Sequence, residues 1–192
     1  MYPWLFTPDT KFSTEGVYSL TLRMSGEAGE QLRSQIKDML DKFLNGLEAT
    51  TGKRPSKLIP LPIKEAHDEQ GNEVLDFKFK MNPSFKGRDG KQVIQRPFVV
   101  DAQLQPLTEE SRVGSGSTVK VNFSASPYSI SAGTGIAFRL VGVQVLDLVA
   151  WGGDGGGFTV EEGFAAPETP KTPVTETPVQ GMEKNVADAA NF

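Results

Sequence analysis

The chain has no cysteine, and its 192 residues contain a single histidine, His67. Without cysteine there is no disulfide bond and no thiolate metal site, as is typical of proteins in a reducing compartment. His67 lies in a polar stretch beside Asp68 and Glu69, and no nucleophile motif accompanies it. We therefore interpret His67 as a solvated residue, and we expect no enzymatic activity, no cofactor and no metal site.

Long apolar runs are also missing, and residues 1–12 lack the basic-then-apolar order of a signal peptide. These absences predict a soluble cytoplasmic protein. The net charge is −4, but it is unevenly distributed. Between Asp76 and Phe98, six basic residues accompany two acidic ones, which gives a local charge of +4 and leaves −8 for the rest. Nucleic-acid binding depends on such local patches and not on the total charge.

Alternation of apolar and polar residues predicts a strand over Gly16–Met24, and helical spacing predicts an amphipathic helix after it. Ser25 is the expected start of the helix and Gly52 its end. Its apolar face is expected to comprise Ala28, Leu32, Ile36, Met39, Leu40, Phe43 and Leu47. We interpret residues 53–72 as a loop or as an irregular segment at the edge of the sheet.

Further strands are predicted at 74–81, 93–102, 115–124 and 135–151, with a hairpin turn at 87–90. In the last strand Ile136, Phe138 and Leu140 share one face, whereas Val141, Val143 and Val145 carry the apolar phase after Gly142 on the other parity. A strand that changes its buried face at a glycine is typical of a coiled barrel strand. The whole pattern predicts a mainly β fold, a small closed barrel of about five strands with one helix.

The composition changes near the end of the chain, where proline, threonine and glutamate dominate. Such a segment buries too little apolar surface to offset the entropy of ordering. We predict a folded domain at 1–166 and a disordered, mildly acidic tail at 167–192. Phe192, an aromatic residue in this polar tail, is predicted to dock a partner.

Cations and aromatic residues are interleaved between positions 76 and 98, and single-stranded nucleic acid requires both, because cations neutralise phosphates and rings stack on bases. Strict alternation favours core positions for Phe77 and Phe79 and leaves the lysines between them exposed. Phe85 and Tyr128, each near a proline, are the stacking candidates, with simple packing as the alternative. The predicted DNA-binding residues are Lys78, Lys80, Phe85, Lys86, Arg88, Lys91, Arg96 and Tyr128.

With these motifs, the chain resembles the single-stranded DNA-binding proteins of tailed bacteriophages. The similar stretches are 5–18, the basic block at 78–101, and 135–145, together with Phe164 and Phe192. The resemblance implies an oligonucleotide-binding (OB) fold and an acidic tail that ends in an aromatic residue. It also implies that the protein coats single strands in replication, recombination and repair, in the cytoplasm of the infected bacterium, with replication proteins as partners of the tail. The alternative is a phage structural or scaffolding protein whose basic strip binds an acidic partner.

Overall fold

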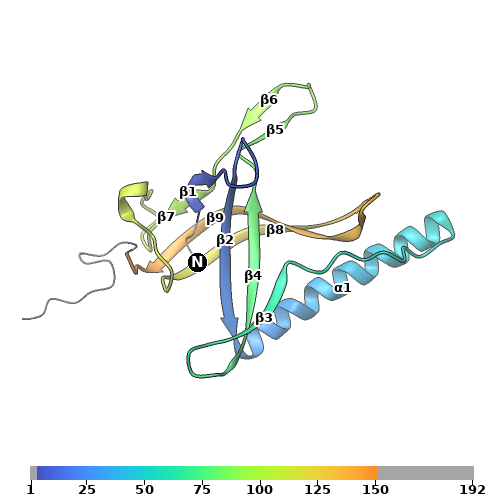
Figure 1. Cartoon of the computed structure of the whole chain (residues 1–192), viewed down its shortest axis with the longest axis horizontal. Coiled ribbons are helices and arrows are strands. Elements are labelled where there is room, and N and C mark those ends of the chain that lie inside the picture. The colour runs from blue at the N-terminus through green and yellow to red at the C-terminus, as the bar shows by residue number, and fades with distance from the viewer. Residues whose placement is uncertain (1–3, 151–192) are drawn as a thin grey trace, which may run out of the picture. The chain divides into compact units, whose positions relative to one another are not determined.

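The computed structural model of the protein describes residues 4–150, which form a seven-stranded sheet, a separate two-stranded hairpin and one long helix (Figure 1). The elements are the strands Trp4–Asp9 (β1), Val17–Ser25 (β2), Ile63–His67 (β3), Glu73–Met81 (β4), Ser84–Lys86 (β5), Gln92–Ile94 (β6), Phe98–Val100 (β7), Thr118–Ile130 (β8) and Gly133–Asp147 (β9), the helix Gly26–Thr51 (α1) and a 3₁₀ turn at Glu109–Ser111 (η1).

The main sheet runs in the order β1-β2-β4-β9-β7, with β3 beside β4 and β8 beside β9. The pairs are antiparallel except β4–β9 and β7–β9, which are parallel. Within residues 4–150 no ladder joins β8 to β1 or β2, so the curved sheet stays open at that side. The prediction of a mainly β, barrel-like fold with one helix is confirmed. The expectation of a closed ring of five strands is corrected to an open sheet of seven.

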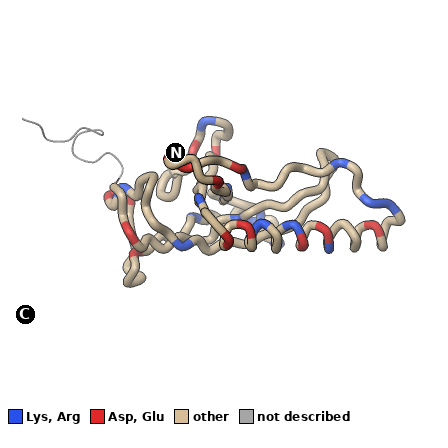
Figure 2. Tube along the Cα trace, turned by 90° about the horizontal axis from the view of Figure 1, so that it is seen from below, with Lys and Arg blue, Asp and Glu red and all other residues tan. Residues whose placement is uncertain are grey.

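Helix α1 has the predicted limits, since it starts after Ser25 and ends at Gly52, whose φ of 71° stops the helix in the left-handed region. Its buried residues are Gly29, Ile36 and Leu44, so the predicted face was partly misassigned. Met39 is 37% exposed and Ala28 is exposed, because the buried face follows Gly29, Ile36 and Leu44 along the helix and both residues lie beside it. Acidic and basic residues are interspersed along its outer side (Figure 2).

Three strands escaped prediction, and one predicted strand is divided. β1 lies ahead of the first predicted strand, β3 lies inside the segment 53–72 that read as a loop, and β5 lies between the predicted strand 74–81 and the predicted turn. The stretch 93–102 forms two short strands, β6 and β7, separated around the buried Pro97, which has no N–H to donate to a ladder. The predicted boundary at residue 166 and the tail 167–192 lie outside the described residues.

The core centres on four phenylalanine rings that come from three strands. Phe79 of β4 lies 4.8 Å from Phe123 of β8 and 5.6 Å from Phe138 of β9, measured between ring centres. Phe77 lies 6.4 Å from Phe138, and Phe77 and Phe79 are both fully buried. The predicted core positions of Phe77 and Phe79 are thus confirmed, and this aromatic cluster sets which face of each strand points inward.

Strand β9 changes its buried face at a bulge, as its sequence predicts. Asn122 pairs with Gly142 and Phe123 with Leu140, so Val141 is left over between the two rungs. Val141 is 39% exposed and does not belong to the buried set in which it was predicted. Gly142 faces the backbone of β7, where an added Cβ would lie only 2.8 Å from the carbonyl oxygen of Phe98.

We therefore expect Gly142→Ala to lower the free energy of unfolding by about 1–3 kcal/mol, because the β7 backbone must shift to admit a methyl group. Gly46→Ala in α1 is the matched control, since its added Cβ has no atom within 4 Å. Replacing glycine inside a helix is expected to stabilise by up to about 1 kcal/mol. Urea unfolding measures both changes, and equal stabilities would contradict the close approach of β7 to β9.

Candidate nucleic-acid interface

The inward aromatic cluster turns the alternate residues of β4, β8 and β9 outward together. Lys78 and Lys80 lie between the buried rings of β4 and are both exposed. Lys80 is paired with Arg139 of β9, and Arg139 is paired with Ser124 of β8. We call the outward surface formed by Lys78, Lys80, Ser124 and Arg139 the basic face.

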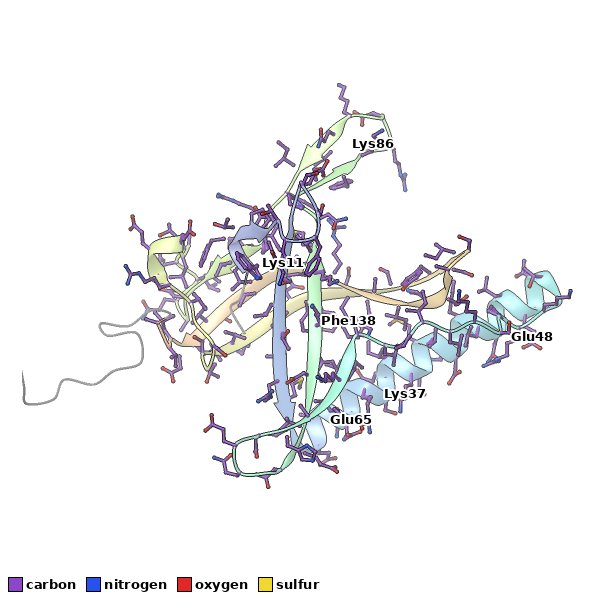
Figure 3. The ribbon with its side chains drawn as sticks, in the orientation of Figure 1. Lys11, Lys37, Glu48, Glu65, Lys86 and Phe138 are labelled. Atoms are coloured by element: carbon purple, nitrogen blue, oxygen red, sulfur yellow. The ribbon has the colours of Figure 1, made fainter. Side chains whose placement is uncertain are left out.

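The hairpin β5–β6 extends from the end of β4 and carries most of the remaining predicted cations (Figures 1 and 3). Its turn is closed by hydrogen bonds from Gly87 N to Lys91 O (2.8 Å) and from Gly90 N to Gly87 O (3.0 Å). Lys86 ends β5, Arg88 and Lys91 flank the turn, and all three are exposed. The turn predicted at 87–90 is thus confirmed, and the hairpin extends the cations beyond the sheet.

Phe85 connects the hairpin to the basic face. Its side chain is 44% exposed, and the guanidinium of Arg139 lies 5.6 Å from the centre of its ring. Arg139 also donates a hydrogen bond to the side-chain oxygen of Gln95, which follows β6. A phenyl ring held beside a cation at a solvent-exposed position offers a stacking surface next to a phosphate partner.

Tyr128 lies on the same outward side of β8 as Ser124, four residues further along and hence about 14 Å away. It is half-buried and pairs with Gly135, where an added Cβ would lie 3.1 Å from the tyrosine hydroxyl. The tyrosine ring therefore lies across a glycine, at the end of the basic face away from the hairpin. Packing accounts for part of its surface and leaves the other part accessible.

Three arginines outside the predicted site are compensated by carboxylates. Arg23 pairs with Asp76, Arg33 with Glu30 and Glu65, and Arg54 with Asp41 and Glu48. No carboxylate of residues 4–150 forms a salt bridge with any of the six predicted cations, which are Lys78, Lys80, Lys86, Arg88, Lys91 and Arg96. Their charges are left to solvent or to an anionic ligand.

Sequence reasoning missed two outward residues of this region. The outward position of Arg139 could have been predicted from the alternation along β9, because Arg139 lies between the buried Phe138 and Leu140. Phe98 is 61% exposed and pairs with Gly142, so it lies on the outward side of β7. No local alternation marks Phe98 as exposed, because the next two residues, Val99 and Val100, are apolar as well.

Other chemistries find little support in the described part of the chain. Residues 4–150 contain no group of three or more His, Asp or Glu side chains placed to hold a metal ion. Over the same residues, α1 is not apolar enough to cross a membrane. His67 is the exposed last residue of β3 and not part of a polar loop.

Asp76 neutralises a cation at the border of the basic face. Arg23 Nε and Nη2 donate to its two carboxylate oxygens at 2.8 and 3.0 Å, across the β2–β4 pair. This hydrogen bond and the charge of Arg23 lower the pKa of Asp76 below its ordinary value, against a smaller effect of burial. The pair therefore stabilises the fold above the pKa of an unfolded aspartate, about 3.9, and this stabilisation is lost as the pH falls through the lower folded pKa.

We expect Asp76→Asn to raise affinity for a single strand several-fold at low salt, because it removes a negative charge two residues from Lys78 and releases Arg23. The variant should lose at most about 1 kcal/mol of stability at neutral pH, since the pair is largely exposed, and this loss should disappear in acid. Asp38→Asn on α1 removes the same charge and releases no arginine. Equal gains in the two variants, measured by fluorescence titration, would show a general charge effect instead.

The fold and its outward face define a single OB-fold domain, open at one side, with uncompensated cations beside exposed rings. The family model described as "Single-stranded DNA-binding protein, Bacteriophage T7" matches residues 2–148, and the chain belongs to this family. The resemblance that the sequence predicts is thereby confirmed.

Curated relatives agree with this assignment. The chain is 28% identical over 131 residues to the single-stranded DNA-binding protein of Enterobacteria phage T3, which covers 62% of the chain and 56% of that protein. It is 29% identical over 105 residues to the protein of the same name from Escherichia phage T7, covering 53% of the chain and 44% of that protein. The chain thus spans about half the length of the curated relatives it matches.

Solved structures agree on the fold. The crystal structure of gp2.5, a single-stranded DNA-binding protein encoded by bacteriophage T7, superposes with a TM-score of 0.64 at 22% identity, over 86% of this chain and 92% of that one. The single-stranded DNA-binding protein of bacteriophage Enc34 in complex with ssDNA gives a TM-score of 0.53 at 18% identity, over 79% and 84% of the two chains.

Proposed function

We propose that the protein binds single-stranded DNA, largely without sequence preference, and coats strands exposed during phage DNA replication, recombination and repair. The observation that carries this proposal is the contact of Arg139 with the exposed ring of Phe85, beside the exposed Lys80 on the neighbouring strand. Family membership supports the same ligand, since the matched relatives are named for it. The chemistry is binding alone, with no bond made or broken, in the cytoplasm of the infected bacterium.

Each predicted residue has a role in this proposal. Lys78 and Lys80 neutralise phosphates that cross the sheet, and the hairpin cations do the same beyond β4. Phe85 stacks a base beside Arg139, and Tyr128 stacks a second base at the opposite end of the basic face. The order from the hairpin to Tyr128 runs through Lys80 and Arg139, which pair across β4 and β9, and then along the β8–β9 pair to Tyr128.

Partners other than DNA are proposed on the sequence alone. Phe192 lies outside the described residues, in the segment rich in proline and threonine. We propose that it docks onto a phage or host replication protein, because an aromatic side chain in a polar segment is a low-cost anchor for a hydrophobic pocket.

The substrate form is the first test of the function. Stacking requires unpaired bases, so we expect tighter binding to a single strand than to the corresponding duplex, with little dependence on base composition. The logarithm of the association constant should fall with the logarithm of salt concentration by about 0.7 for each phosphate neutralised. Titrations with single-stranded DNA, duplex DNA and RNA at several salt concentrations measure both quantities. Equal affinity for the duplex would favour the scaffolding alternative, in which the cations bind an acidic protein.

The same titrations should distinguish the contribution of the cations to binding from that of the aromatic rings. Lys80→Ala is expected to reduce the salt slope by about 0.7 and to weaken binding to all sequences alike. Phe85→Ala is expected to cost about 1–3 kcal/mol of binding free energy with the slope unchanged. Lys37→Ala, an exposed lysine on α1 (Figure 3), is the control for general charge. A Phe85→Ala protein with parental affinity and unaltered thermal unfolding would remove this ring from the site.

A further inference from the structure

Phe12 is the most exposed large hydrophobic residue in the described part of the chain, with 89% of its side chain accessible. It lies in the connection between β1 and β2, which is ordered by its own hydrogen bonds. Asp9 Oδ1 accepts from Lys11 N at 3.0 Å, and Gly16 N donates to Ser13 O at 3.0 Å. A phenyl ring that is 89% exposed on an ordered turn contributes nothing to the core and is accessible to a ligand.

A cation lies over the Phe12 ring, as one does over Phe85. Lys11 Nζ is 5.4 Å from the centre of the Phe12 ring, compared with 5.6 Å between the Arg139 guanidinium and the Phe85 ring. These are the two cation–ring contacts found within residues 4–150, and both involve exposed phenylalanines. The Phe12 turn therefore repeats the ring-plus-cation arrangement of the candidate site.

One hydrogen bond places the two arrangements on either side of the hairpin base. Ser84 Oγ donates to the Glu15 carboxylate at 2.9 Å, which attaches the Phe12 turn to the first residue of β5. Phe85 is the next residue, and successive residues of a strand face opposite sides. Ser84 thus faces the Phe12 turn, while Phe85 faces Arg139. Lys11 and Lys86 lie toward the same end of the β2–β4 pair (Figure 3).

We propose that single-stranded DNA bound on the basic face continues across the base of the β5–β6 hairpin and stacks one more base on Phe12, with Lys11 neutralising a neighbouring phosphate. This proposal rests on the proposed function and extends its site. Ile94 supports the path, because it pairs with Ser84, and so faces the same side of the hairpin as the Phe12 turn, and because 84% of its side chain is exposed. The single-stranded DNA would then pass over the base of the hairpin, which projects beyond the main sheet.

The charges around this path favour DNA over a protein partner. Lys86, Arg88 and Lys91 have no carboxylate partner among the described residues, and Asp89 is the single acid of the hairpin. Glu15, an acid of the Phe12 turn, is engaged by Ser84, and Asp9 accepts from the backbone N–H of Lys11. Cations without carboxylate partners next to exposed rings suit a single strand, because its phosphates bind cations and its bases stack on rings.

The test is the length dependence of binding by the full chain, with oligothymidylates from about 4 to 16 nucleotides, the range of site sizes for such folds. Phe12→Ala should leave the affinity for the shortest strands unchanged and reduce that for the longest by about 5-fold or more, the effect of one lost stack. Leu104→Ala is the matched control, since Leu104 is an exposed apolar residue (65%) in a loop. Phe12→Trp should keep the affinity for long strands, and its added fluorescence should be quenched only by them.

The outcomes distinguish the proposed stacking on Phe12 from the proposed function, single-stranded DNA binding, on which it rests. If Phe12→Ala binds all lengths like the parent while Phe85→Ala still weakens binding, the extension is wrong and the function stands. If neither variant differs because single strands do not bind, the function itself fails. If Phe12→Ala instead changes the sedimentation coefficient of the free protein, Phe12 belongs to a protein contact and the extension is also overturned.

Discussion

The aromatic cluster in the core determines the placement of every cation on the sheet. Phe77 and Phe79 face Phe123 and Phe138 in the core. Because successive side chains of a strand point to opposite faces, the residues that alternate with these rings on β4 and β9 face outward. Lys80 and Arg139 meet on that side across one parallel rung. A substitution that disturbed the packing of these rings would therefore rotate the cations as well, so that core stability and the proposed binding surface depend on the same contacts.

The bulge at Val141 lies where strand β9 passes from one parallel neighbour to another. Before the bulge β9 pairs with β4 through Arg139, and after it with β7 through Gly142 and Val143. The extra residue restores the inward phase for Val143 and bends the strand, which a curved sheet requires. It also turns Phe98 to the outside, beside the face that carries the cations. A regular strand would have buried either the first half of β9 or the second.

The sequence predicted what depends on local alternation and missed what depends on distant contacts. The limits of α1, the inward rings of β4 and the hairpin turn follow from periodicity and from Gly52 and Gly90, and all are confirmed. The contact of Arg139 with Phe85 joins residues 54 positions apart, and no local pattern indicates it. β3 was missed because its five residues carry charges on the exposed side and gain strand character only from pairing with β4. Whether the sheet closes into a barrel or stays open at one side depends likewise on tertiary packing.

An acidic protein can present a surface for an anionic polymer only if its own carboxylates are kept away from the cations. Here several carboxylates are engaged away from the basic face: Glu30 and Glu65 with Arg33, Asp41 and Glu48 with Arg54, and Glu15 with Ser84. Each exposed pair adds little to stability, but it prevents a flexible acid from competing with phosphate for a nearby lysine. The uncompensated lysines repel one another, and this cost is small at the surface because water and salt screen it. The local charge of +4 between Asp76 and Phe98 is therefore a better indicator of the binding surface than the net charge of −4, which points the other way.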